Sequence, residues 1–124
     1  MTNSVPETDA LIGRAGAGDR AAEHVLFEQH RERLRRMIAI RMDQRLAARF
    51  DPSDVVQEAL LTASVQLPEY ARQRPLPFYP WLRQIAWHRL IRMGRHHLAT
   101  QKRSVAREQA LGISDTSATV TSLA

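Results

Sequence analysis

Apolar side chains recur at the spacing of an α-helix along the most highly charged stretch of the chain, and this feature limits the fold more than any other. Between residues 20 and 48, Phe27, Leu34, Ile38 and Met42 follow one another at steps of seven, four and four. This spacing places them on one helix face that must be buried, while arginines and glutamates fill the other face. Nothing in the sequence alternates like a Val/Ile/Thr-rich strand, so we predict an all-α fold.

Helix-start residues divide the chain into about four helices. Asp19 follows a glycine-rich hinge and can cap one helix, and Asp51, with Pro52 in the first turn after it, can cap another. Three prolines are expected to interrupt helical structure across residues 67–77. The sequence therefore predicts a compact bundle with helices over about residues 7–15, 20–48, 52–66 and 78–98.

Length and composition limit the class of protein. A chain of 124 residues with 44% hydrophobic content fits one domain with a modest core. The absence of cysteine excludes disulfides, thiolate zinc sites and cysteine nucleophiles. With no long apolar run and a polar start, we expect a cytoplasmic protein that does not contact a membrane. Residues 1–10 are expected to be flexible, and residues 104–124 to form a linker or disordered tail.

Positive charge is concentrated in one part of the sequence. The net charge is +5, and from Tyr70 to Arg107 there are nine basic residues and no acidic one. These are Arg72, Arg74, Arg83, Arg89, Arg92, Arg95, Lys102, Arg103 and Arg107. Such a stripe is typical of proteins that bind a phosphate backbone.

The third predicted helix has two distinct faces. Its inward stripe consists of Val56, Ala59, Leu60 and Ala63. A second face carries Asp54, Gln57, Glu58 and Leu61 at positions i, i+3, i+4 and i+7. This second face is either a solvated polar surface that includes one leucine or a contact surface for a partner helix or groove.

The last predicted helix also has two faces, and a basic, aromatic linker precedes it. One broad arc forms a core face of Phe78, Trp81, Leu82, Ile85, Ala86 and Met93. Trp87 and Ile91 point nearly the opposite way, either as a second packing surface or as an exposed aromatic for stacking on bases. Together with the linker, this helix supplies cations for phosphates and pockets for unstacked bases, as single-strand binding requires.

Three motifs in order resemble bacterial sigma-70 family sigma factors of the extracytoplasmic-function (ECF) type. Residues 54–59 (DVVQEA) resemble the family's D-x-V-Q-E segment. Residues 78–86 (FYPWLRQIA) look like the F-x-x-W-L-x-x-I-A signature that opens its promoter-recognition helix. Residues 11–34 are similar to its opening pattern of a short helix, a G-D turn and a long helix. The resemblance covers residues 11–103 and implies the N-terminal region 2 domain.

The resemblance implies a binding function in transcription initiation and no enzymatic activity. The third helix is expected to dock on the clamp helices of the largest RNA polymerase subunit through Asp54, Gln57, Glu58 and Leu61. The linker and last helix are expected to recognise and melt the promoter −10 element by capturing flipped bases of the non-template strand. The residues expected to contact DNA are Arg72, Arg74, Phe78, Tyr79, Arg83, His88, Arg89, Arg92, Arg95 and His96.

Three departures from the family pattern affect these expectations. His88 stands where many ECF factors carry asparagine, which affects the promoter sequence expected, and Pro80 replaces a small or polar residue before the tryptophan. After Gly112 only a short tail remains, so the helix-turn-helix domain that reads the −35 element (region 4) is expected to be absent, and truncation is the favoured explanation. An anti-sigma protein is an expected partner by resemblance, and no cofactor is implied.

Two other classes of function are alternatives to this assignment, an enzyme and a basic interaction module. The pairs His24 with Glu28 and His30 with Glu32, and the adjacent His96 and His97, form no zinc-helix set, and no Gly-rich phosphate loop occurs. A basic helical module that binds duplex nucleic acid or a protein partner without promoter opening is the stronger alternative, because the basic stripe would be sufficient for it.

Overall fold

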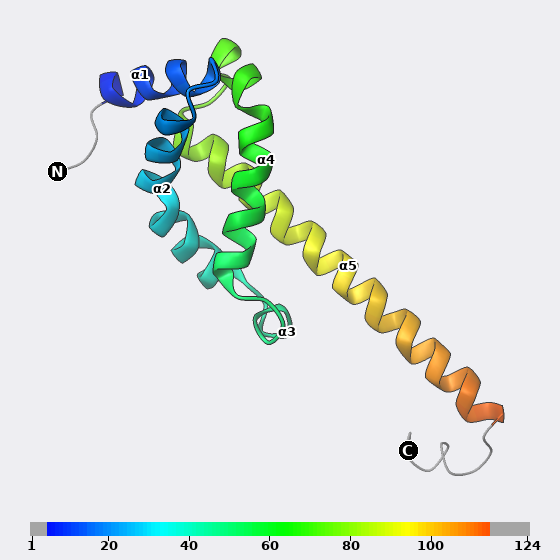
Figure 1. Ribbon diagram of the computed structural model, residues 1–124. Helices are drawn as coiled ribbons and strands as arrows, with labels where there is room; N and C mark the ends of the chain where they lie inside the picture. Colours follow the sequence, from blue (N-terminus) through cyan, green and yellow to red (C-terminus); the bar gives the residue numbers. More distant parts are fainter. Residues whose placement is uncertain (1–4, 115–124) are drawn as a thin grey trace. The chain divides into compact units, whose positions relative to one another are not determined.

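The computed structural model describes residues 5–114 and contains five α-helices and no strand within that range (Figure 1). The helices are α1 (Val5–Gly16), α2 (Arg20–Arg41), α3 (Gln44–Ala47), α4 (Pro52–Gln73) and α5 (Phe78–Ser114). The prediction of an all-α fold is confirmed, and a short fifth helix is added to the four expected. Contacts divide the chain after Ile91 into a first unit, residues 1–91, and a second unit, residues 92–124.

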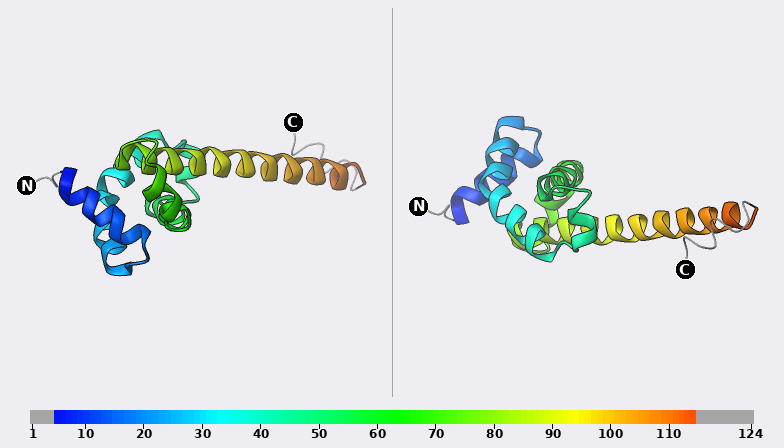
Figure 2. Two further views of the ribbon diagram at one scale, coloured as in Figure 1. Left: turned by 90° about the horizontal axis from the view of Figure 1, so that it is seen from above. Right: turned by 90° about the horizontal axis from the view of Figure 1, so that it is seen from below.

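The core of the first unit is formed by the apolar stripes that the sequence predicts. Helices α1, α2 and α4 each contact the other two (Figure 2). The predicted stripes of α2 and α4 are buried, and the first turns of α5 add their own apolar side chains. The largest fully buried side chains are Leu26, Leu34, Ile38, Leu67, Leu82, Val55 and Val56. Burial of apolar surface stabilises a fold by about 25 cal/mol per Å² removed from water, so these buried stripes are the main source of stability.

The hinge between α1 and α2 brings α1 close to α4. Asp19 caps α2 as predicted, since its carboxylate accepts a hydrogen bond from the Ala22 amide at 3.1 Å. This bond, with a further one from Arg14, lowers the pKa of the Asp19 carboxyl.

A Cβ on Gly16 would lie 2.4 Å from the Cβ of Ala71 on α4. Glycine at position 16 therefore permits the close approach of the two helices.

Helix α2 ends earlier than the sequence predicts. The prediction of one helix through residue 48 is wrong, because Met42 is extended and Asp43 starts α3. The Asp43 carboxylate accepts a hydrogen bond from the Arg45 amide at 2.7 Å. A short acidic side chain that binds the following backbone amides competes with continuation of the preceding helix. Leu46 of α3 is buried, which anchors the new turn.

Helix α4 continues past the proline that was expected to end it. Asp51 and Asp54 form a reciprocal capping box at its start, but the predicted end near residue 66 is wrong, since Pro68 lies inside the helix. An internal proline costs about 3 kcal/mol or more. Leu67, just before Pro68, and Tyr70, two residues after it, are 0% and 3% exposed, so tertiary packing of this turn offsets the cost.

Helix α5 runs through both units and is longer than predicted. Its first part packs in the first unit, where Leu82 and Ala86 are fully buried. The predicted end near residue 98 is wrong, because the helix continues to Ser114. Residues 101–110 are exposed and include many strong helix formers and no proline, so intrinsic propensity favours the helix there.

The two ends of the described range lie in helices. Residues 5–10 belong to α1, and residues 104–114 belong to α5. The remaining parts of the predicted flexible start and tail, residues 1–4 and 115–124, lie outside the described residues. Among residues 5–114, none of the helices combines the length and the apolar composition that a membrane span requires.

Candidate functional site

The outward face of α4 carries the four residues predicted to bind a partner. Asp54, Gln57, Glu58 and Leu61 are all exposed on this helix. Leu61 is 61% exposed, and Val65, one turn further along, is 81% exposed. We call these five residues the α4 face. It presents an apolar end next to a polar one.

The polar side chains of the α4 face are held by contacts within the first unit. The Asp54 carboxylate accepts a hydrogen bond from the Asp51 amide at 3.2 Å in the capping box. The side-chain carbonyl oxygen of Gln57 accepts a hydrogen bond from the guanidinium of Arg31 on α2, at 3.5 Å. These contacts limit the rotamers of the polar side chains, so less conformational entropy would be lost on binding.

Arg89 of α5 is part of this arrangement and does not project freely toward solvent. Its Nη2 lies 2.5 Å from Oε1 of Glu58, and its side chain is 31% exposed. Its Nε is buried with no hydrogen-bond partner among the described residues. Arg89 is among the residues predicted to contact DNA, and its guanidinium is paired with a carboxylate on α4. This pair connects α5 to α4.

Phe78, which is also among the predicted DNA contacts, is buried at the start of α5. Its side chain is 5% exposed. Its ring lies 6.4 Å from Phe27, 5.8 Å from Tyr70 and 5.7 Å from Trp81, measured between centroids. Tyr70 and Trp81 stack on each other at 4.2 Å. Phe78 therefore anchors an aromatic cluster beneath the start of α5.

The same cluster holds the linker between α4 and α5. The Tyr70 hydroxyl donates a hydrogen bond to the Leu76 carbonyl at 2.5 Å. Burial raises the pKa of the Tyr70 phenol, so the hydroxyl keeps its proton and remains a donor. This hydrogen bond to the linker backbone gives the linker a defined shape, although it contains two prolines, Pro75 and Pro77.

The two arginines predicted at this end of α4 both have partners. Arg74 ends α4 in the left-handed conformation, at φ 42°, and its Nη1 lies 2.8 Å from the Asp9 carboxylate of α1. Arg72 forms an ion pair with Glu69 one turn earlier. Arg72 is highly exposed, so a phosphate could exchange with its carboxylate partner at little cost. Arg74 is more strongly engaged, because it also contacts the Asp9 carbonyl at 3.3 Å.

Tyr79 lies at the surface beside the buried cluster, and two side chains of α2 fix its ring. The Arg33 guanidinium carbon lies 3.8 Å from the ring centroid, and the His30 ring stacks at 6.0 Å. Burial, and then the charge of Arg33, lower the pKa of His30. The His30 Nε2 is buried with no hydrogen-bond partner among the described residues. Tyr79 is thus an oriented, half-buried aromatic at the start of α5.

A pocket of about 510 Å³ adjoins these aromatic side chains. We call it the linker pocket. Its lining combines aromatic rings, prolines and the Arg74–Asp9 pair: Thr8, Asp9, Ile12, His30, Tyr70, Arg74, Pro75, Leu76, Pro77, Phe78, Tyr79 and Pro80. Its volume is in the range of small-ligand sites, and aromatic walls beside a cation suit a flat, polar ring. Thr8, Asp9, Ile12 and His30 were not predicted, since α1 and α2 bring them to the linker from distant positions.

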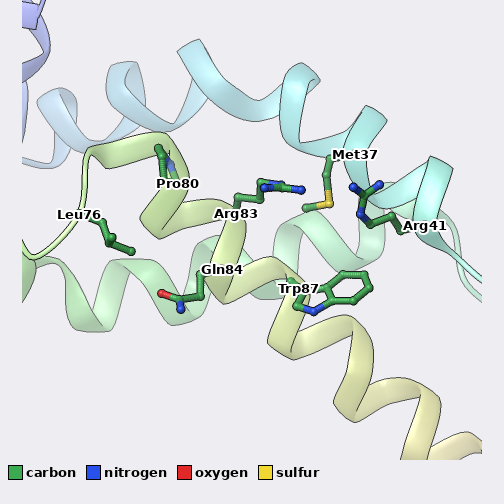
Figure 3. Close-up of a pocket in the computed structure, with 7 residues that line it drawn as sticks. All are labelled: Met37, Arg41, Leu76, Pro80, Arg83, Gln84 and Trp87. Atoms are coloured by element: carbon green, nitrogen blue, oxygen red, sulfur yellow. The ribbon is translucent and has the colours of Figure 1, made fainter.

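A second pocket, of about 380 Å³, lies between α2, the linker and α5 (Figure 3). We call it the α2–α5 pocket. Its lining residues are Met37, Arg41, Leu76, Pro80, Arg83, Gln84 and Trp87. Arg83 is among the predicted DNA contacts, and the sequence allows Trp87 either to pack or to stack on a base. Arg41 lines the pocket from α2, and no sequence pattern points to it.

The remaining predicted DNA residues project from α5. His88 is exposed in the first unit. Arg92, Arg95 and His96 are exposed in the second unit. Among the described residues, no group of three or more histidine, aspartate or glutamate side chains is placed to hold a metal ion. The exposed side chains of α5 therefore offer cations and hydrogen-bond donors to a ligand.

Comparison with known families connects these surfaces to a function. Residues 26–103, more than half of the chain, match the family model described as Sigma-70 region 2. No match was found among curated proteins or among solved structures. Domains of this family act by binding and not by catalysis, and the matched segment contains most of α2, all of α4 and the basic part of α5. The chain therefore belongs to the sigma-70 family as a region 2 domain, with a sigma factor's role in binding RNA polymerase core and in recognising and melting promoter DNA.

Proposed function

We propose that the chain is the front domain of an ECF-type sigma factor, spanning residues 11–103, which docks on polymerase core through the α4 face and captures −10 bases at the linker. The observation that carries this proposal is the exposed Leu61 and Val65 beside polar side chains that the fold already holds in place. The ECF motifs of residues 54–59 and 78–86 support the same assignment. A bacterial, cytoplasmic site of action follows from this role.

The proposed partner of the α4 face is the pair of clamp helices in the largest polymerase subunit. Leu61 and Val65 supply apolar surface that is removed from water on docking. Asp54, Gln57 and Glu58 supply polar contacts around it. An apolar centre with a polar rim is the usual anatomy of a protein interface. An anti-sigma protein that competes for this surface is a proposed regulator.

The linker pocket is the proposed site for a flipped base of the non-template strand. Tyr79 provides a partly exposed ring surface, and the linker backbone is held by the Tyr70 hydroxyl. Unstacking a base costs a few kcal/mol, and stacking on protein returns about 1–3 kcal/mol per base, so capture can support melting. Phe78 supports this pocket from beneath.

The cations that remain exposed are proposed to contact the strand. In the first unit these are Arg72, Arg83 and His88. His88 replaces the asparagine of many ECF factors, so we expect a different base preference at its contact. In the second unit, Arg92, Arg95 and His96 form a separate set of proposed phosphate contacts.

The first test is a pull-down of polymerase core with wild type and a Leu61→Arg variant. Leu61 makes a cleaner target than Glu58, because replacing Glu58 also breaks the contact with Arg89. Ile40→Arg is the matched control, since Ile40 is 77% exposed on α2 and lies outside the α4 face. We expect Leu61→Arg to lose core binding by roughly 100-fold, as for a central interface residue, and Ile40→Arg to retain it. Equal binding by all three proteins would exclude the α4 face.

A second candidate is a basic helical module that binds duplex DNA without promoter opening. It is favoured by the run of exposed basic residues in the second unit between Arg92 and Arg107. Binding to a −10 non-template strand, to its duplex and to a scrambled strand separates the two. A sigma domain prefers the −10 single strand, whereas a basic module prefers duplex and ignores sequence.

A further inference from the structure

The end of α4 has a backbone conformation that its residue type does not favour. Among residues 5–114, Arg74 is the one residue other than glycine with a positive φ, at φ 42° and ψ 58°. A Cβ disfavours this left-handed conformation, and glycine is the usual residue at such a helix end. The Arg74 amide donates a hydrogen bond to the Tyr70 carbonyl at 2.7 Å, which closes the helix. Further contacts of Arg74 must offset the strain of this turn.

The side chain of Arg74 is held by α1, which comes from the other end of the sequence. Its Nη1 donates a hydrogen bond to the Asp9 carboxylate at 2.8 Å, and its Nη2 donates one to the Asp9 backbone carbonyl at 3.3 Å. Its Nε donates to the Ala71 carbonyl at 3.4 Å. Each guanidinium nitrogen therefore has an acceptor within the protein. Arg72 differs, because its ion pair with Glu69 lies within α4 and connects no second helix.

The linker that follows Arg74 is short and is held at two points. Its middle residue is Leu76, between Pro75 and Pro77. The Leu76 carbonyl accepts the hydrogen bond from the buried Tyr70 hydroxyl, and Arg74 connects the start of the linker to α1. Proline fixes its own φ but leaves ψ free, so the prolines alone do not determine the path of the linker. The path depends on these two anchors.

The same part of α1 lines the linker pocket. Thr8, Asp9 and Ile12 line this pocket together with Arg74 and the linker itself. Figure 1 shows α1 beside the end of α4 from which the linker leaves. A pocket that distinguishes one base from another needs walls that are held firmly in place. A displaced linker would change the shape of the pocket and leave the exposed cations of α5 where they are.

We propose that Arg74 is a positioning residue, whose contact with Asp9 of α1 fixes the linker and thereby the shape of the pocket that selects a base. The proposal rests on the base capture proposed above and assigns a part in it to α1. Arg74 acts through the linker and not on a phosphate, because its donors are already used within the protein. A carboxylate on α1 thus supports the selection of a base, although its charge opposes the binding of any DNA strand.

The first test measures the linker without DNA. Nitrogen-15 NMR relaxation of the full chain reports on the amide of Leu76, which lies between the two linker prolines. In Asp9→Ala we expect the order parameter of this amide to fall from about 0.85, typical of rigid backbone, toward about 0.6. Glu32→Ala is the matched control, since Glu32 is an exposed carboxylate that pairs with Arg35 on α2 and lines neither pocket. An unchanged order parameter in Asp9→Ala would overturn the proposal.

The second test measures the selection of a base. In Asp9→Ala, the ratio of the affinities for a −10 non-template strand and a scrambled strand should fall about two- to fivefold, as for a lost, partly exposed ion pair. The affinity for the scrambled strand should not fall, because the protein becomes more positive. An equal rise for both strands would overturn the proposal, since Asp9 would then act only as a charge. A wild type without preference for the −10 strand would refute the proposed base capture, and the relaxation result would still decide whether α1 holds the linker.

Variants of Arg74 separate its side chain from its backbone. Arg74→Gly keeps the left-handed turn, because glycine adopts a positive φ without strain, and removes the contact with α1. It should lower the affinity ratio at least as much as Asp9→Ala, and the double variant should lose no more than Arg74→Gly alone. The slope of log K against log salt should equal that of wild type. A slope reduced by about 0.7, the value for one lost single-strand phosphate contact, would make Arg74 a phosphate contact and overturn its positioning role.

Discussion

The α4 face and the linker are both surfaces proposed to bind a partner, but they are held in place by different forces. On the α4 face, Gln57 and Glu58 are positioned by partly exposed contacts with Arg31 and Arg89. At the linker, the backbone is held by a buried aromatic cluster and one short hydrogen bond from Tyr70. Exposed ion pairs contribute little, whereas a buried aromatic contributes several kcal/mol.

This difference has a consequence for function. The α4 face rests on a regular helix with its own capping box, so its shape survives the loss of any single side-chain contact. The linker has no hydrogen-bonding pattern of its own, and its shape depends on the packing beneath it. Changes in the core should therefore affect the DNA side of the domain before they affect the polymerase side.

The largest expected effect comes from removing the aromatic support of the linker. Phe78→Ala should lower the free energy of unfolding by about 3–5 kcal/mol, because a buried ring is replaced by a cavity. Tyr79→Ala, one residue later, should cost about 1 kcal/mol, since that ring is partly exposed and loses mainly its contact with Arg33. Urea unfolding of both variants measures the difference. Similar losses would contradict the division between a buried support and a surface contact.

A smaller effect is expected at the α4 face. Glu58→Ala should cost about 0.5–1 kcal/mol, because Arg89 then lacks its partner while its Nε stays buried. The double variant Glu58→Ala/Arg89→Met removes the unpaired charge as well, and should be no less stable than Glu58→Ala alone. Unfolding free energies of the two single variants and the double variant form a double-mutant cycle. Strictly additive losses would mean that the contact carries no coupling energy.

The sequence predicts those parts of the structure that depend on neighbouring residues. Asp19 and Asp51 start helices as predicted, because a cap acts within its own turn. Pro68 does not end α4, because residues packed from other helices stabilise the turn around it. The same limit applies to the proposed sites. Arg89 looks like a free cation in the sequence because its partner Glu58 is on another helix, and Arg41 gives no signal because its pocket forms only in the fold.

The smallest expected effect is a pH dependence that originates beside the linker. The His30 ring lies 5.1 Å from Phe78 and stacks on Tyr79, and burial followed by the charge of Arg33 lowers its pKa. The unfolded chain therefore takes up this proton more readily than the folded one. The contribution of neutral His30 is fully present above its ordinary pKa of 6.5, and is lost as pH falls from there toward the lowered folded value.

A His30→Gln variant, which stays neutral, isolates this contribution. The stability of wild type relative to the variant should be constant above about pH 6.5 and should fall below it, because protonation opposes folding only in wild type. Urea unfolding between about pH 7.5 and 5.5 measures this difference, and comparison with the variant cancels the titration of the carboxylates. A difference that does not change with pH would show that His30 is as easily protonated in the folded chain as in the unfolded one. A falling difference would show that protonation of His30, beside the aromatic support of the linker, destabilises the domain in mild acid.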